Sequence, residues 1–135
     1  MTEDNKRKNI AAETARGDDS LASARILLAA GMFADAVSRA YYGAFHYARA
    51  MLLAVGEEPR THGGLERLLH RDVVRTGALS PDVAKLFSRL LKFRQDADYT
   101  AEFVFSAEGA AEEVAAAGEF VAAAKGVLAR ATSQG

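Results

Sequence analysis

The chain has 135 residues, half of them hydrophobic and 26% charged, with 17 basic and 18 acidic side chains and a net charge of −1. These values fit one globular domain and exclude disordered and fibrous chains. The near-neutral charge excludes a global positive field for nucleic acid, so any phosphate contact must come from a local patch. The absence of cysteine excludes disulfides, thiolate nucleophiles and the usual structural zinc sites. With no secretory signal and no apolar stretch of membrane length, we expect a cytoplasmic protein that does not enter a membrane.

The first expected element is a helix over residues 4–30, because its residues favour helix and no strand pattern competes. Gly17 marks a place where this helix could be interrupted, since glycine weakens a helix interior. We therefore expect an N-terminal extension, helical or disordered, over residues 1–17. A helical bundle is expected over residues 18–130, followed by a tail over residues 131–135.

A second helix is expected over residues 33–55, where apolar residues recur at spacings of three and four and Gly56 follows. This repeat is typical of a helix with one face in the core. The apolar stripe consists of Phe33, Val37, Tyr41, Ala44, Ala48, Leu52 and Val55. Tyr47 is expected at the flank of that stripe.

Three further helices begin at recognisable capping residues, which are Thr61, Ser80 with Pro81, and Ser106. These helices are expected over residues 61–76, 83–97 and 106–130. A strand at the sequence FVF, residues 103–105, is the alternative for that segment, but a single strand would have no partner. The chain is therefore expected to be all-α, an antiparallel four-helix bundle with an additional short helix.

A polar stripe runs beside the core stripe of the second helix. Arg39, Tyr42, His46 and Arg49 are separated by three, four and three residues, so they share one side of a helix. In one interpretation they are scaffold, with ion-paired arginines and a hydrogen-bonded interhelical histidine. In the other they contact phosphate or RNA, because guanidinium groups bind phosphates, tyrosines stack on bases and histidine transfers protons near neutral pH.

A second polar cluster ends the fourth helix. Arg94 and Asp98 are four residues apart and can form an ion pair, and Tyr99 follows directly. An exposed pair of this kind contributes little to stability. If the pair is buried against the second helix, it could organise a site. His62 and His70 are too far apart for metal ligation within one turn. We expect no metal site and no cofactor.

The blocks AVSRAYYGAFHYARAMLLAVGEEPRTHGGL and LLKFRQDADY, in this order in an all-helical chain, resemble the HEPN family of small prokaryotic proteins. The resemblance covers residues 18–130. It implies a HEPN-like bundle that forms a homodimer, with a polar site in the groove between the two subunits. It also implies a minimal nucleotidyltransferase partner in a toxin and antitoxin pair. In ribonuclease members, an arginine and a histidine separated by four to six residues cleave RNA without a metal; Arg94 matches that arginine, but Tyr99 stands where the histidine is expected.

The leading hypothesis is therefore a dimeric binding component of a HEPN and nucleotidyltransferase pair, with a nucleotide, RNA or the partner bound in the dimer groove. Arg94 is expected to contact the anion and Asp98 to orient it. The neighbouring residues expected at the site are Tyr99, Arg39, Tyr42, His46 and Arg49. One alternative is a metal-independent ribonuclease toxin with a diverged Arg-x4-Tyr site, in which His46 or Tyr99 handles the proton. The other alternative is a helical scaffold without a ligand.

Overall fold

Within the part of the chain that the structure describes, five α-helices and one π-helical turn form the fold. The computed structural model describes residues 2–99 and 104–134, apart from the side chains of residues 97, 98 and 132–134. In chain order the elements are α1 (Glu3–Ala29), α2 (Phe33–Ala54), α3 (His62–Leu69), the π-helical turn η1 (His70–Val74), α4 (Pro81–Tyr99) and α5 (Ala107–Gln134). Within the described ranges there is no strand, which confirms the predicted all-α class.

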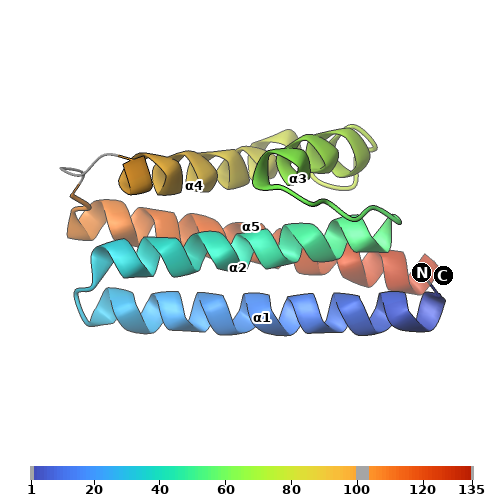
Figure 1. Ribbon diagram of the computed structural model, residues 1–135, viewed down its shortest axis with the longest axis horizontal. Coiled ribbons are helices and arrows are strands. Elements are labelled where there is room, and N and C mark those ends of the chain that lie inside the picture. Colours follow the sequence, from blue (N-terminus) through green and yellow to red (C-terminus); the bar gives the residue numbers. More distant parts are fainter. Residues whose placement is uncertain (1, 100–103, 135) are drawn as a thin grey trace.

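The four long helices form an antiparallel bundle. Helices α1 and α4 run in one direction, and α2 and α5 run in the other (Figure 1). Helices α2 and α5 pack against each other in the middle, with α1 on one side and α4 on the other; the described parts of α1 and α4 do not touch. The short α3 crosses near the end of α2 and the start of α4. No described helix holds an apolar stretch long enough to cross a membrane.

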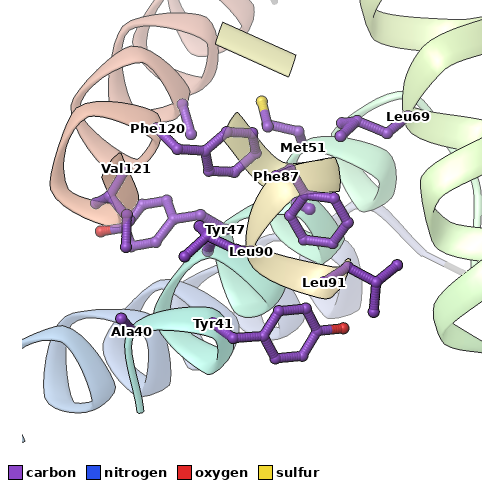
Figure 2. Packing of buried hydrophobic residues seen from close by; sticks show 14 of the residues in the cluster. Ala40, Tyr41, Tyr47, Met51, Leu69, Phe87, Leu90, Leu91, Phe120 and Val121 are labelled. Carbon is purple, nitrogen blue, oxygen red and sulfur yellow. The ribbon is translucent and has the colours of Figure 1, made fainter. Parts of the chain in front are cut away.

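The core lies where α2, α4 and α5 meet. Phe87 of α4 is completely buried, and its ring centroid lies 5.6 Å from that of Phe120 on α5 and 5.8 Å from that of Tyr41 on α2 (Figure 2). Met51 and Leu90 fill the space around these rings. Tyr41 is therefore a core residue, as its place in the apolar stripe predicts.

The helix boundaries follow the predicted capping residues. Thr61 Oγ1 accepts a hydrogen bond from the Gly64 amide at 2.9 Å, and Ser80 and Ser106 cap α4 and α5 in the same way. Helix α2 ends before Gly56, whose φ of 87° is a left-handed conformation that favours glycine. The predicted third helix is only partly α-helical, because the backbone widens into η1 after Leu69. Residues 104 and 105 do not form a strand, and residue 103 lies outside the described part of the chain.

Helix α1 continues without interruption through Gly17, which the sequence had marked as a possible break. Gly17 is buried where α1 crosses α2, and a Cβ atom there would lie 2.6 Å from a ring carbon of Tyr47. The expectation that Tyr47 lies on the flank is wrong, because its ring is 2% exposed and covers this glycine. Its hydroxyl donates a hydrogen bond to Asp18 Oδ1 at 2.6 Å. The glycine thus permits a close helix crossing instead of ending a helix.

A carboxylate is buried between α4 and α5. Glu113 on α5 is 1% exposed, and its Oε1 accepts a hydrogen bond from Arg89 Nε on α4 at 2.7 Å. Its Oε2 is buried and has no hydrogen-bond partner among the described residues. Burial raises the pKa of Glu113 more than the nearby Arg89 guanidinium lowers it. The folded state therefore binds a proton at Glu113 more tightly than the unfolded chain does.

This raised pKa predicts a specific pH dependence of stability. On acidification from about pH 7 to about pH 4.5, protonation of Glu113 favours the folded state and opposes the losses from other carboxylates. Glu113→Gln removes this contribution, so the variant's free energy of unfolding should fall relative to that of the wild type as the pH is lowered. Urea unfolding at the two pH values measures the change. Glu112→Gln is the control, because Glu112 is an exposed neighbour of Arg89; an equal pH response in both variants would contradict the prediction.

Candidate functional site

The polar stripe of α2 forms a continuous surface. We call Arg39, Tyr42, Phe45, His46 and Arg49 the α2 polar face. Arg39 is exposed and the other four side chains are half-buried. Helix α5 packs against α2. Glu13 of α1, His62 of α3 and Arg94 of α4 each contact a residue of the polar face. Side chains from three other elements therefore reach the same surface.

Arg94 of α4 meets the polar face at Tyr42. Its Nη2 donates a hydrogen bond to the Tyr42 hydroxyl at 2.9 Å, and its Cζ lies 5.0 Å from the centroid of the Tyr42 ring and 5.1 Å from that of the Tyr41 ring. The Cζ of Arg39 lies 5.4 Å from the centroid of Tyr42. Two guanidinium groups therefore contact one tyrosine ring, an arrangement in which the ring's negative π surface attracts both cations.

His62, the first residue of α3, lies beside this arginine and tyrosine cluster. Its Nδ1 is hydrogen-bonded to the Tyr41 hydroxyl at 2.5 Å, and its ring centroid lies 4.8 Å from that of Phe45. Burial raises the pKa of Tyr41 well above its ordinary value, although Arg94 acts in the opposite direction. Burial, and then the charge of Arg94, lower the pKa of His62. Both groups are therefore neutral near neutral pH.

Glu13 of α1 binds the other end of the polar face. Its Oε2 lies 2.8 Å from His46 Nδ1, and its Oε1 lies 3.4 Å from Arg49 Nε. Arg49 also donates from Nη1 to the Pro59 carbonyl at 3.0 Å, which ties the segment before α3 to α2. Glu13 is 8% exposed, and a carboxylate this buried needs a cationic partner such as Arg49. This end of the face is therefore held by an ion-pair network.

Two pockets of the described structure lie away from the α2 polar face. One pocket of about 330 Å³ lies between α3 and α4, and its lining includes Glu66, His70 and Lys85. A second pocket, of about 360 Å³, lies between α1 and the ends of α2 and α5. Neither pocket is lined by a residue of the polar face or by Arg94.

Comparison with known proteins places this arrangement in a family. Residues 13–127 match the HEPN domain family, which is most of the chain. The chain belongs to the HEPN family. Both blocks that carry the resemblance, including Tyr42 and Arg94, lie inside the matched range.

Several curated relatives support this assignment. "Putative toxin MJ0605" from Methanocaldococcus jannaschii is 31% identical over 96 residues, which are 71% of this chain and 72% of that protein. "UPF0332 protein PH1297" from Pyrococcus horikoshii is 41% identical over 68 residues, which are 50% of this chain and 48% of that protein. A UPF0332 protein from Thermotoga maritima is 32% identical over 84 residues, which are 62% of this chain and 64% of that protein. The match therefore spans about half of the Pyrococcus protein and just under two thirds of the Thermotoga protein.

This HEPN chain brings together part of the site predicted from its sequence. Arg94 contacts Tyr42 directly, and Arg39 lies next to the same ring. His46 and Arg49 instead bind Glu13, the interhelical arrangement expected for a structural role, although the ring of His46 still lies 6.4 Å from that of Tyr42. A role for His46 in ligand binding or catalysis stays a prediction.

The end of α4 contributes less to the described surface. Tyr99, which stands where HEPN ribonucleases have a histidine, is 88% exposed at the last position of the helix. The side chain of Asp98 lies outside the described residues, so its predicted pairing with Arg94 stays a prediction. The part of the HEPN motif that the structure locates in a network of contacts is therefore Arg94.

Sequence reasoning missed two residues of this network. His62 is not among the residues that the sequence predicts at the site, and Glu13 lies in the segment expected to be an extension. The available signal for His62 was its position after the capping Thr61, which fixes the start of α3. Glu13 had no such signal, because the close crossing of α1 and α2 at Gly17 brings it to His46.

Proposed function

We propose that this HEPN protein binds the phosphate groups of RNA or of a nucleotide on the α2 polar face, with Arg94 as the principal anion contact. The observation that carries the proposal is the gathering of Arg94 and Arg39 around Tyr42. Among the described residues, no carboxylate forms an ion pair with Arg39. Guanidinium groups match phosphate oxygens in geometry and charge.

The proposal includes the partners that the family relationship supports. The chain acts as a homodimer, in which the second subunit covers the open polar face. It forms the toxin-like component of a pair with a minimal nucleotidyltransferase. Membership of the HEPN family and the relatives named as toxins support this role.

Arg94→Ala is expected to weaken binding of a fluorescein-labelled single-stranded RNA by about 10- to 100-fold. A hydrogen bond to a charged group contributes about 1.5–3 kcal/mol, and about 1.4 kcal/mol is a factor of ten in affinity. Fluorescence anisotropy at physiological salt measures the affinity, and competition with ATP tests whether a free nucleotide uses the same surface. Arg75→Ala is the control, because Arg75 is an exposed arginine in the turn after η1. Equal losses in both variants, or no binding by the wild type, would contradict the proposal.

The assembly is tested separately. Light scattering of the purified chain should give the mass of a dimer, and a nucleotidyltransferase encoded beside this gene should co-purify with it. A strict monomer at micromolar concentration would overturn the role of a second subunit. If a neighbouring nucleotidyltransferase does not bind, the proposed pair is overturned. Phosphate binding is then still tested by the RNA affinity of the Arg94→Ala variant.

A further inference from the structure

A pocket lies between α3 and α4, which run side by side at one edge of the bundle (Figure 1). Its volume of about 330 Å³ is near the lower end of the range for ligand sites, about 300–1,000 Å³. Part of the lining is apolar and comes from Leu69 of α3 and from Pro81 and Ala84 of α4. The pocket therefore has room for one or two side chains of another molecule, and it offers them an apolar surface.

Two basic side chains at this pocket are not used by the rest of the chain. Arg67 of α3 and Lys85 of α4 are exposed, line the pocket and form no ion pair with any described residue. The nearby Arg71 is instead bound by Glu57 at 3.0 Å and by Asp72 at 2.8 Å. The two cations at the pocket are therefore available to an anionic partner.

The backbone beside the pocket departs from α-helical geometry. The π-helical turn η1 starts at His70, which lines the pocket, and the Arg75 amide donates to the His70 carbonyl at 3.0 Å. Such turns are rare and are found frequently at functional sites. The position of η1 at the end of α3 supports a role of this pocket beyond packing.

The groups around the pocket favour a carboxylate over a phosphate. Val83 N–H donates to Ser80 Oγ at 3.2 Å, Ala84 N–H donates to the Ser80 carbonyl at 3.1 Å, and Pro81 has no N–H. These first-turn amides of α4 are thus already bonded, whereas a phosphate at a helix N-terminus depends on such donors. Glu66, which also lines the pocket, repels a phosphate dianion more strongly than a single carboxylate, and its oxygens can accept hydrogen bonds from peptide N–H groups.

We propose that the pocket between α3 and α4 docks an acidic segment of a partner protein, in which an aspartate or glutamate stands next to an apolar residue. The carboxylate binds to Arg67 and Lys85, and the apolar side chain packs on Leu69 and Ala84. This charge complementarity identifies the chemistry of the partner. The site takes a protein, whereas the proposed function concerns RNA on the α2 polar face, and neither depends on the other.

A peptide selection on the full chain tests the site. Short random peptides displayed on phage are selected on the wild type, with an excess of Gly63→Leu protein in solution to remove peptides that bind elsewhere. Gly63 lines the pocket, and a Cβ atom there meets no atom within 4 Å, so the leucine should narrow the pocket without disturbing the fold. Far-UV circular dichroism checks the fold of this variant. The selected peptides should contain an acidic residue beside an apolar one.

The selected peptides are then synthesised with fluorescein, and anisotropy at physiological salt measures their affinity. Arg67→Ala and Lys85→Ala should each weaken binding about 3- to 10-fold, because each removes one charged contact. Lys92→Ala is the matched control, because Lys92 is an exposed lysine about two turns further along α4 and does not line the pocket. A peptide whose acidic residue is replaced by its amide should lose a similar affinity, and Lys85→Ala should then add little further loss.

The outcomes decide between this site and nucleic acid. The proposal is overturned if no peptide is selected, if the selected peptides lack acidic residues, or if Lys92→Ala loses as much affinity as Lys85→Ala. It is also overturned if Gly63→Leu and Arg67→Ala weaken binding of a labelled single-stranded RNA while no peptide binds.

Arg94→Ala separates the docking site from the proposed function. This variant should lose RNA binding and keep the peptide, and loss of the peptide in Arg94→Ala would overturn the site. Selective loss of the peptide in Gly63→Leu, Arg67→Ala and Lys85→Ala supports the site, whether or not RNA binds at Arg94.

Discussion

Replacement of Phe87 by alanine is expected to lower the free energy of unfolding by about 3–5 kcal/mol, the usual cost of removing a buried phenylalanine ring. Phe87 is completely buried, and its ring contacts both Tyr41 and Phe120, so the cavity would open where α2, α4 and α5 meet. A small domain has only about 5–15 kcal/mol of stability, so this variant should unfold at a much lower urea concentration.

Urea unfolding followed by far-UV circular dichroism measures the effect. Phe33→Ala is the control, because Phe33 is only partly buried in the small cluster at one end of the bundle. A loss in Phe87→Ala no greater than that in Phe33→Ala would show that the centre of the bundle is not its main source of stability.

Replacement of Gly17 by leucine is expected to cost about 3 kcal/mol or more, at the upper end of overpacking effects. Even a methyl group at this position would approach the Tyr47 ring to 2.6 Å, and the Gly43 carbonyl oxygen lies 3.2 Å from the same point. Helices α1 and α2 would have to separate, which would also move Glu13, one turn away, from His46. Thermal and urea unfolding should show the loss.

Gly126→Leu is the matched control in another long helix. The nearest side-chain atom to a Cβ at Gly126 is the flexible end of Arg130, at 3.3 Å, so this substitution should be neutral or stabilise the helix by up to about 1 kcal/mol. If both leucine variants lose the same stability, the contact between Gly17 and Tyr47 does not explain the loss.

The sequence predicts the helices better than it predicts the way they cross. Thr61, Ser80 and Ser106 mark helix starts correctly, because an N-cap depends on residues only three positions away. Gly17 was interpreted as a possible break for the same local reason, since glycine weakens an isolated helix. Its actual role depends on Tyr47, which is 30 positions away in the chain, and no local pattern contains that information. The burial of Tyr47 was missed for the same reason.

At the candidate site too, local sequence patterns predict some features, whereas others depend on contacts that only the folded structure makes. Periodicity placed Arg39, Tyr42, His46 and Arg49 on one face of α2, and the family resemblance drew attention to Arg94. Neither predicts the hydrogen bond between Arg94 and Tyr42, which joins residues 52 positions apart. His62 has no periodic signal at all, because it lies at the first position of a short helix. Its contact with Tyr41 follows from the path of the connection between α2 and α3, which only the folded structure determines.

That connection, residues 55–61, is held close to the site by three side-chain bonds. Arg49 donates to the Pro59 carbonyl, Thr61 caps the Gly64 amide, and His62 is bonded to Tyr41. Fixing one residue's backbone costs about 1–2 kcal/mol of conformational entropy, and here folding itself has already imposed that order. The site is thus preorganised, so a phosphate ligand loses little affinity to loop ordering. The Gly64 and Leu65 amides, which donate to Thr61, should exchange slowly in the free protein and change little when RNA binds.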